Sequence, residues 1–398
     1  MKKVLFVCYG GGHVRMVVPV AQALQDAGLA QVQVLGLTTA APVVRASGLA
    51  LLQIKNFLTP DDALAVARGG QLAAALGGVA DPEESAAYLG LSFAELAREI
   101  GEASASESYA RDGRQAFLPR QLLTRILSTV KPDLVVATNA PRGERAAILA
   151  AGDLGIPSVC LIDLFAFDEV RWLAAPGYAR RLCVLSEDVK SFLVRSGRRD
   201  DEVAVTGNPA FDVLQEPSVA AAGAMLRQGQ GWEGCRVLLW PNQVEPARHP
   251  FDGRPGDPGL PGQVLQALCN WTIDHEDAVL CVRPRPGEPM ARLPSHPRIL
   301  LTGQDWALPP LLHAIDTVVT LSSTVGLEGF LSGARVIQVL GSVFDEALPL
   351  ARFGMADAAV PLHELAAALD QWTPLQRRPV SGGLLATPRV VEVMREFL

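Results

Sequence analysis

The chain has 398 residues, of which 49% are hydrophobic and 19% charged, and it carries a net charge of −7. This length is more than one hydrophobic core usually serves, so it predicts two α/β domains, and the composition is that of a soluble globular protein. The acidic balance argues against nucleic acid as the main partner, because surfaces that bind a duplex are usually basic.

Two further features bear on the cellular compartment. Six cysteines are scattered without a C-x-x-C pair, which favours reduced thiols in a cytoplasmic protein over disulfides or a zinc site. No stretch of about 20 uninterrupted apolar residues is present, so the sequence predicts no membrane span. The first apolar run, Val4–Tyr9, is shorter than the apolar core of a signal peptide and is typical of a strand.

The N-terminal segment predicts a Rossmann-like opening. The strand is followed by a glycine turn, Gly10, Gly11 and Gly12, and residues 15–25 have the apolar spacing of a helix. The glycines do not form G-x-G-x-x-G, so the dinucleotide fingerprint is absent. We expect His13 to face the crevice at the carboxyl end of the sheet; a histidine that only contacts the backbone is the alternative.

Residues 61–127 are rich in Ala, Leu and Glu with helical spacing, and they predict several helices broken at 69–70, 77–78, 82 and 113. Such an insertion between early strands would form one wall of a site for an acceptor substrate. The alternative is that its apolar faces only pack in the hydrophobic core. Its arginines beside apolar residues permit peripheral contact with a membrane. Its glutamates dilute that pattern and favour a solvated helix face.

Polar side chains follow the next two predicted strands. Residues 133–137 lead into a polar loop with Asn139, and residues 158–162 are followed by Asp163. Because the carboxyl ends of parallel strands meet at one edge of a sheet, we expect Asn139 and Asp163 to lie at the same edge as His13.

The strand pattern restarts after residue 212, and residues 203–212 are interpreted as the segment that crosses between domains. A strand at 235–240 precedes a Pro- and Gly-rich loop of about twenty residues, a length that usually indicates function or disorder. This loop contains Gln243. The next strand, 278–282, is followed by Arg283 and Arg285, which are placed to reach a phosphate or are surface charges.

Residues 317–340 predict a strand, a polar turn, a short helix and a further strand. The helix begins with Ser322, Ser323 and Thr324, whose free backbone N–H groups and positive dipole end suit a phosphate. Glu328 lies four residues after Thr324 and therefore on the same helix face, where a carboxylate can accept two hydrogen bonds from a ribose. A solvent-facing Glu on an ordinary helix is the alternative.

Three segments resemble a known family, the GT-B glycosyltransferases and their relatives. Gly10–His13 is similar to the glycine–histidine turn of the N-acetylglucosaminyltransferase that completes lipid II. The segment 205–209, Val-Thr-Gly-Asn-Pro, resembles the linker of UDP-N-acetylglucosamine 2-epimerase-like proteins and glycosyltransferases. Residues 322–328 resemble the donor-nucleotide motif of capsule-polysaccharide transferases. Together the three segments span nearly the whole chain.

The resemblance implies an α/β protein with two Rossmann-like domains that face each other across a cleft. The domains would be residues 1–206 on the acceptor side and 207–386 for the nucleotide-sugar donor, with a helix at 387–398 that packs back on the first domain. His13 or Asp163 would be the general base. The donor nucleotide would contact the residues Gln243, Arg283, Arg285, Ser322, Ser323, Thr324 and Glu328.

The function implied is transfer of a sugar from a nucleotide-sugar, most simply a UDP-sugar, to a hydroxyl of a small or lipid-linked acceptor, without a metal or other cofactor. Hydrolysis or 2-epimerisation of the nucleotide-sugar on the same fold is the first alternative, and non-catalytic binding is the second. The 2-epimerase pattern of two consecutive acids is absent, because Glu328 is followed by Gly329. The base, the sugar, the acceptor and the oligomeric state stay open.

Overall fold

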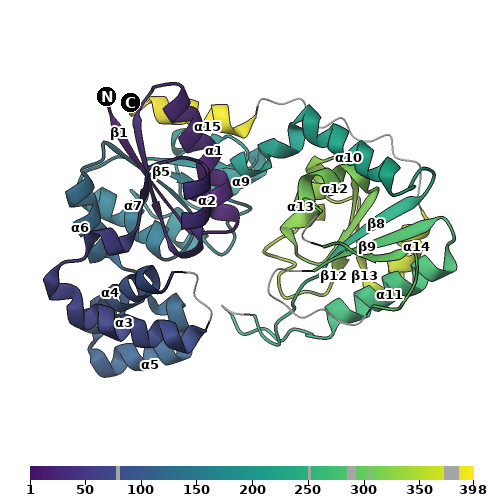
Figure 1. The fold of residues 1–398 in the computed structure, drawn as a ribbon, viewed down its shortest axis with the longest axis horizontal. Coiled ribbons are helices and arrows are strands. Elements are labelled where there is room, and N and C mark those ends of the chain that lie inside the picture. The colour runs from purple at the N-terminus through teal and green to yellow at the C-terminus, as the bar shows by residue number, and fades with distance from the viewer. Residues whose placement is uncertain (78–80, 250–251, 285–292, 304–305, 372–384) are drawn as a thin grey trace. The chain divides into compact units, whose positions relative to one another are not determined.

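The computed structural model describes residues 1–77, 81–249, 252–284, 293–303, 306–371 and 385–398. The chain divides into two compact units, one formed by Met1–Ala210 with Leu384–Leu398 and the other by Phe211–Gly383. Each unit is built on its own parallel sheet with helices on both faces (Figure 1). We describe them one at a time.

The first unit contains a seven-stranded parallel sheet in the order β3-β2-β1-β4-β5-β6-β7. The strand order reverses between β1 and β4, so the carboxyl ends of these two neighbours define the switch point at which α/β proteins bind ligands. The strands are β1 (Lys3–Cys8), β2 (Gln31–Gly36), β3 (Leu51–Leu52), β4 (Leu134–Thr138), β5 (Ser158–Leu161), β6 (Arg181–Val184) and β7 (Val203–Val205).

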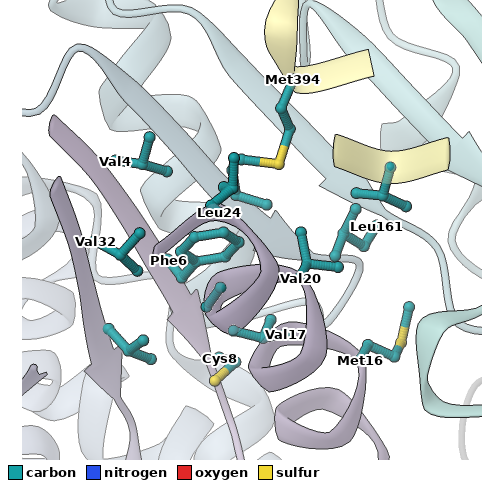
Figure 2. Packing of buried hydrophobic residues seen from close by; sticks show 14 of the residues in the cluster. Val4, Phe6, Cys8, Met16, Val17, Val20, Leu24, Val32, Leu161 and Met394 are labelled. Carbon is teal, nitrogen blue, oxygen red and sulfur yellow. The ribbon is translucent and has the colours of Figure 1, made fainter. Parts of the chain in front are cut away.

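Strand β1 is buried on both faces, as expected for the centre of a parallel sheet. Val4, Phe6 and Cys8 point to the face covered by α1 (Gly12–Asp26), where they pack with Val17 and Val20 (Figure 2). Strand β7 lies within the segment that the sequence analysis interpreted as a crossing between domains. That interpretation was wrong for its first three residues, which are too few for an apolar pattern to be recognised.

The helices of the first unit are α1, α2 (Ala41–Ala46), α3 (Ala63–Leu76), α4 (Pro82–Ile100), α5 (Glu102–Asp112), α6 (Arg120–Val130), α7 (Gly143–Asp153), α8 (Val170–Leu173), α9 (Glu187–Arg195) and α15 (Ala386–Arg395). Helices α3, α4 and α5 form a cluster of their own at one end of the unit (Figure 1). They are the helical insertion between β3 and β4 that the sequence predicts.

The predicted break at residues 69–70 is wrong, because α3 runs unbroken through both glycines. The reason is the close approach of α4: a Cβ atom on Gly69 would clash with the Ala86 carbonyl oxygen, and one on Gly90 with the Ala65 carbonyl oxygen. The glycines therefore serve contact between two helices, whereas Gly77 ends α3 with a φ of 65°.

Helix α15 belongs to the first unit although it ends the chain. Its apolar side chains Val390, Val391 and Met394 are buried against α1 and the sheet, and Met394 points toward Leu24 (Figure 2). The two termini lie in the same unit as a result (Figure 1).

The second unit contains a six-stranded parallel sheet in the order β10-β9-β8-β11-β12-β13. Its strand order reverses between β8 and β11. The strands are β8 (Arg236–Pro241), β9 (Ala278–Arg283), β10 (Ile299–Leu301), β11 (Thr317–Thr320), β12 (Arg335–Leu340) and β13 (Ala358–Pro361). The last of these was not predicted, because it is only four residues long.

Helices α11 (Leu260–Asp274) and α14 (Leu365–Asp370) pack together on one face of this sheet. Helices α10 (Pro217–Gly229), α12 (Leu308–Ala314) and α13 (Thr324–Leu331) cover the other face (Figure 1). Across the described ranges, no helix combines the length and the apolar character needed to cross a membrane.

Candidate functional site

The turn after β1 carries the first group of candidate residues. Gly11 precedes α1 with a φ of 68°, a backbone conformation that favours glycine, and Gly12 opens the helix. Gly10 lies so close to Thr39 that a Cβ atom would clash with the threonine side chain. These constraints bring His13 into the first turn of α1, at the carboxyl end of β1 and next to β4.

A chain of hydrogen bonds holds His13. The Nδ1 atom of His13 lies 2.8 Å from Oγ1 of Thr138, the last residue of β4. The same hydroxyl donates to Oε1 of Glu144 over 3.1 Å. Because a hydroxyl has one proton to donate, it accepts from Nδ1–H of His13, and this assigns the lone pair of the imidazole to Nε2.

Glu144 is fully buried in the first turn of α7 and also accepts from the backbone N–H of Tyr9 over 2.7 Å. Burial raises the pKa of its carboxyl group, while the nearby His13 and the hydrogen bonds from Tyr9 and Thr138 lower that pKa in part. A buried acid joined to a histidine through a hydroxyl stabilises the protonated imidazole once it forms.

A pocket of about 540 Å³ opens beside His13 within the first unit. This volume lies in the range of small-molecule sites. Its walls come from the β1 turn, from Thr38 and Thr39 after β2, and from helices α3 and α4, which contribute Leu76 and Tyr88.

One side of the pocket joins these helices to α7. The hydroxyl groups of Tyr9 and Tyr88 are hydrogen-bonded to each other. Arg142, which precedes α7, stacks its guanidinium carbon 5.0 Å from the centre of the Tyr9 ring and lines the same pocket. The insertion and the sheet edge therefore form one continuous surface around the space next to His13.

Asp163 follows β5 at the same sheet edge but does not line this pocket. Its Oδ1 accepts from Nδ2 of Asn139 over 2.9 Å, and its backbone N–H donates to Oδ1 of Asn139 over 3.2 Å. Nearby, burial and then the charge of Asp163 raise the pKa of Glu169 to about 7. The structure thus pairs Asp163 with Asn139, whereas His13 is paired with Thr138.

In the second unit, Gln243 joins the two strands of the switch point. It follows β8, and its Oε1 accepts from the backbone N–H of Leu321 over 2.8 Å and from Oγ1 of Thr320 over 3.3 Å. The side chain of Thr320 in turn accepts from the backbone N–H of Ser323 over 3.0 Å. Gln243 therefore fixes the polar turn between β11 and α13.

Helix α13 presents the remaining predicted residues. Ser323 is its N-cap and accepts from the Val325 N–H over 3.2 Å. Thr324 is exposed in the first turn. The hydroxyl oxygen of Ser322 lies 3.5 Å from that of Ser342. Glu328 is half-buried one turn further along. The helix lies close to β11 because it has glycines where other side chains would collide with the strand or with Leu350, namely at Gly326 and Gly329.

Of the two predicted arginines, Arg283 ends β9 and donates from Nη1 to the carbonyl oxygen of Trp306 over 2.8 Å. Arg285 lies outside the described residues. Among the side chains that the structure does describe, no group of three or more His, Cys, Asp or Glu residues is arranged to hold a metal ion.

The sequence analysis did not identify Thr138, Glu144, Arg142 or Tyr88 as site residues. Thr138 had a usable signal, since it ends a strand beside Asn139. Glu144 had none, because an acid in the first turn of a helix is ordinarily explained by the helix dipole and solvent. Tyr88 lies in an insertion whose fold the sequence does not fix.

No protein-family model matches the chain, and no curated protein matches its sequence. Solved structures do resemble its fold. UDP-GlcNAc 2-epimerase from Neisseria meningitidis, bound to UDP-GlcNAc, has 14% identity and a TM-score of 0.61, with 99% of this chain and 100% of that one covered. The glycotransferase of kitacinnamycin has 13% identity and a TM-score of 0.52, covering 100% and 95%.

Anabaena HepE, in complex with UDP and glucose, has 14% identity and a TM-score of 0.52, covering 100% of this chain and 96% of its own. At sequence identities this low, the similarity is evidence for a shared fold and not for a shared activity. Since each comparison covers both parallel sheets, this chain has the GT-B fold, with two Rossmann-like α/β units, as the sequence predicts.

Proposed function

We propose that this protein is a glycosyltransferase that moves a sugar from a nucleotide-sugar to the hydroxyl group of an acceptor bound in the pocket of the first unit. The observation that carries the proposal is the arrangement His13–Thr138–Glu144 at the edge of that pocket. A histidine whose Nδ1 is fixed by a hydroxyl and a buried acid is suited to remove a proton through Nε2.

The second unit supports a nucleotide diphosphate as the leaving group. The polar start of α13, with Ser322, Ser323 and Thr324, offers N–H and hydroxyl donors to phosphate, and Glu328 is proposed to bind the ribose hydroxyls. Arg283 and Arg285 would add positive charge at the end of β9. Uridine is the proposed base, because two of the three solved structures named above carry UDP or UDP-GlcNAc in their names.

Transfer is preferred over reactions of the donor alone because the insertion α3–α5 builds a pocket next to His13. An enzyme that hydrolyses or epimerises its nucleotide-sugar needs no second organic substrate. UDP-GlcNAc 2-epimerisation is the second candidate, since a solved epimerase shares the fold over the full chain.

The charge of the leaving diphosphate is proposed to be balanced by α13 and the arginines, so activity should persist in EDTA.

The proposal that the donor is a nucleotide-sugar is tested by calorimetric titration with UDP, CDP, GDP and dTDP. We expect UDP to bind best and Glu328→Ala to weaken it at least ten-fold, because the carboxylate would lose two hydrogen bonds to the ribose. Glu276→Ala, which changes an exposed acid of the same unit, is the control and should bind UDP as the parent does. Failure of the wild-type protein to bind any nucleotide would refute the proposal.

The reaction is then identified from its products. With the UDP-sugar incubated alone, a C2 epimer detected by NMR would indicate epimerisation, and free sugar with UDP would indicate hydrolysis. Release of UDP that depends on an added acceptor, and that His13→Ala abolishes while UDP still binds, is the result expected for a transferase.

A further inference from the structure

Two arginines line the pocket beside His13, Arg114 from the turn after α5 and Arg142 from the start of α7. Within the described parts of the chain, neither forms an ion pair with a carboxylate. Other arginines of the first unit do pair with an acid, as Arg111 does with Asp112. A pocket with two unneutralised guanidinium groups attracts an anion.

Arg142 is the stronger of the two anchors. It is half-buried, its guanidinium stacks on the Tyr9 ring, and its Nε–H is buried without a hydrogen-bond partner in the described structure. Leaving a charged donor unpaired is costly, and a guanidinium fixed by an aromatic ring is preorganised to bind a carboxylate or phosphate through two hydrogen bonds. Arg114 is exposed and adds charge at the rim.

Among the described residues, the acids near the pocket form no ion pair with either arginine, although Glu144 interacts electrostatically with Arg142. Asp81 lines it but is held by Lys55, whose Nζ lies 2.9 Å from Oδ2, and it also caps α4 through the Glu84 N–H. The carboxylate of Glu144 is fully buried behind Thr138 and is engaged by Tyr9 and Thr138. The rest of the lining is mixed: Leu76 and Leu89 form an apolar strip beside the Tyr88 ring, and Thr38, Thr39 and Ser85 add hydroxyl groups.

We infer that the acceptor is an amphipathic hydroxy acid, a molecule with a carboxylate or phosphate that binds Arg142 and Arg114, an apolar body against α3 and α4, and its hydroxyl toward His13. This inference rests on the proposed function, because it assigns the pocket to the acceptor. The donor diphosphate is the other possible source of an anion, and the test distinguishes the two.

Ligand-observed NMR at saturating UDP would compare 4-hydroxybenzoate, phenyl phosphate and the neutral 4-hydroxybenzamide as probes. We expect the wild-type protein to bind at least one of the two anionic probes about ten-fold more tightly than the amide. Arg142→Gln should abolish that preference, Arg142→Lys should restore part of it, and Arg114→Gln should reduce it. Arg111→Gln removes a surface arginine of the same segment and should leave it unchanged.

UDP affinity is measured for each variant at the same time, together with the melting temperature to verify folding. No preference for either anion in the wild-type protein would overturn the inference, as would a preference that survives in Arg142→Gln and Arg114→Gln. If Arg142→Gln weakened UDP binding as much as it weakened binding of the anionic probe, the arginines would belong to the donor site. That result would also overturn the inference. Absence of UDP binding in the wild-type protein would instead refute the proposed function.

Discussion

At the scale of single residues, the central feature is the hydroxyl of Thr138 between a histidine and a buried acid. Thr138→Val keeps the shape of the side chain but breaks both hydrogen bonds. We expect kcat to fall about ten-fold or more with unchanged UDP affinity, because Glu144 no longer stabilises the protonated imidazole.

Two variants separate this positioning role from a general loss of structure. Thr138→Ser restores the hydroxyl and should recover most of the activity. Thr129→Val removes an exposed hydroxyl that bonds only to its own helix, and it should have no effect. A parental kcat in Thr138→Val, or a loss of kcat that Thr138→Ser does not recover, would contradict the role assigned to the threonine.

Glu169 makes a second residue-scale prediction, on stability. Burial and the charge of Asp163 raise its pKa from 4.5 to about 7, so the folded state holds this proton more tightly than the unfolded state does. The resulting stabilisation is complete below about pH 4.5 and is lost as the pH rises through 7. Glu169→Gln should therefore raise the stability of the first unit at pH 8 by about 1–3 kcal/mol and leave it little changed at pH 4.5.

Thermal unfolding followed at pH 4.5, 6, 7 and 8 measures this effect, with the exposed Glu99→Gln as the control. Parallel curves for the wild-type protein and Glu169→Gln across the whole pH range would count against the assignment. The sequence could not predict this residue, because its shift comes from burial beside Asp163, which only the folded chain brings about.

At the scale of elements, the helices α3 and α4 hold one wall of the pocket through a backbone contact at Gly69 and Gly90. Gly69→Ala should destabilise the first unit by about 1–3 kcal/mol, because the new methyl group would collide with the Ala86 carbonyl. Binding of probes in the pocket should weaken with it. Gly70→Ala, one residue along the same helix, meets no atom within 4 Å and should be neutral or up to about 1 kcal/mol stabilising.

Urea unfolding of the two variants measures the difference. Equal stabilities would show that α3 and α4 can separate without cost. This contact also marks the limit of prediction from sequence: a pair of glycines normally indicates a break. Long apolar runs such as Val4–Tyr9 predicted the central strands, whereas the three residues of β7 and the four of β13 were too short to be recognised.

At the scale of the whole molecule, the sequence predicted two α/β units because the strand–helix pattern restarts along the chain, and the resemblance of three segments to a known family implied the GT-B fold. It also predicted which strand ends carry polar residues, such as His13 and Ser323. It could not predict that Thr138 bonds His13 while Asn139 bonds Asp163, because this depends on the register between β1, β4 and β5. Residues far apart in sequence meet only in the sheet.

The return of α15 to the first unit provides the whole-molecule prediction. Met394→Ala removes a fully buried side chain that packs on Leu24 and should cost about 2–5 kcal/mol. Hydrogen exchange followed by mass spectrometry should show faster exchange in β1 and α1, with β8 and β11 unchanged. Glu392→Ala, on the exposed face of the same helix, is the control. Faster exchange in both units alike would mean that they unfold together.

The same helix sets an order of events during synthesis. The ribosome completes residue 210 well before it reaches Val390, Val391 and Met394, which close the first hydrophobic core. At about 5–20 residues per second this interval is roughly 10–40 seconds, during which the face of α1 stays exposed. All residues of the second unit are synthesised before these three side chains are. The unit whose synthesis begins first is therefore the one whose hydrophobic core is completed last.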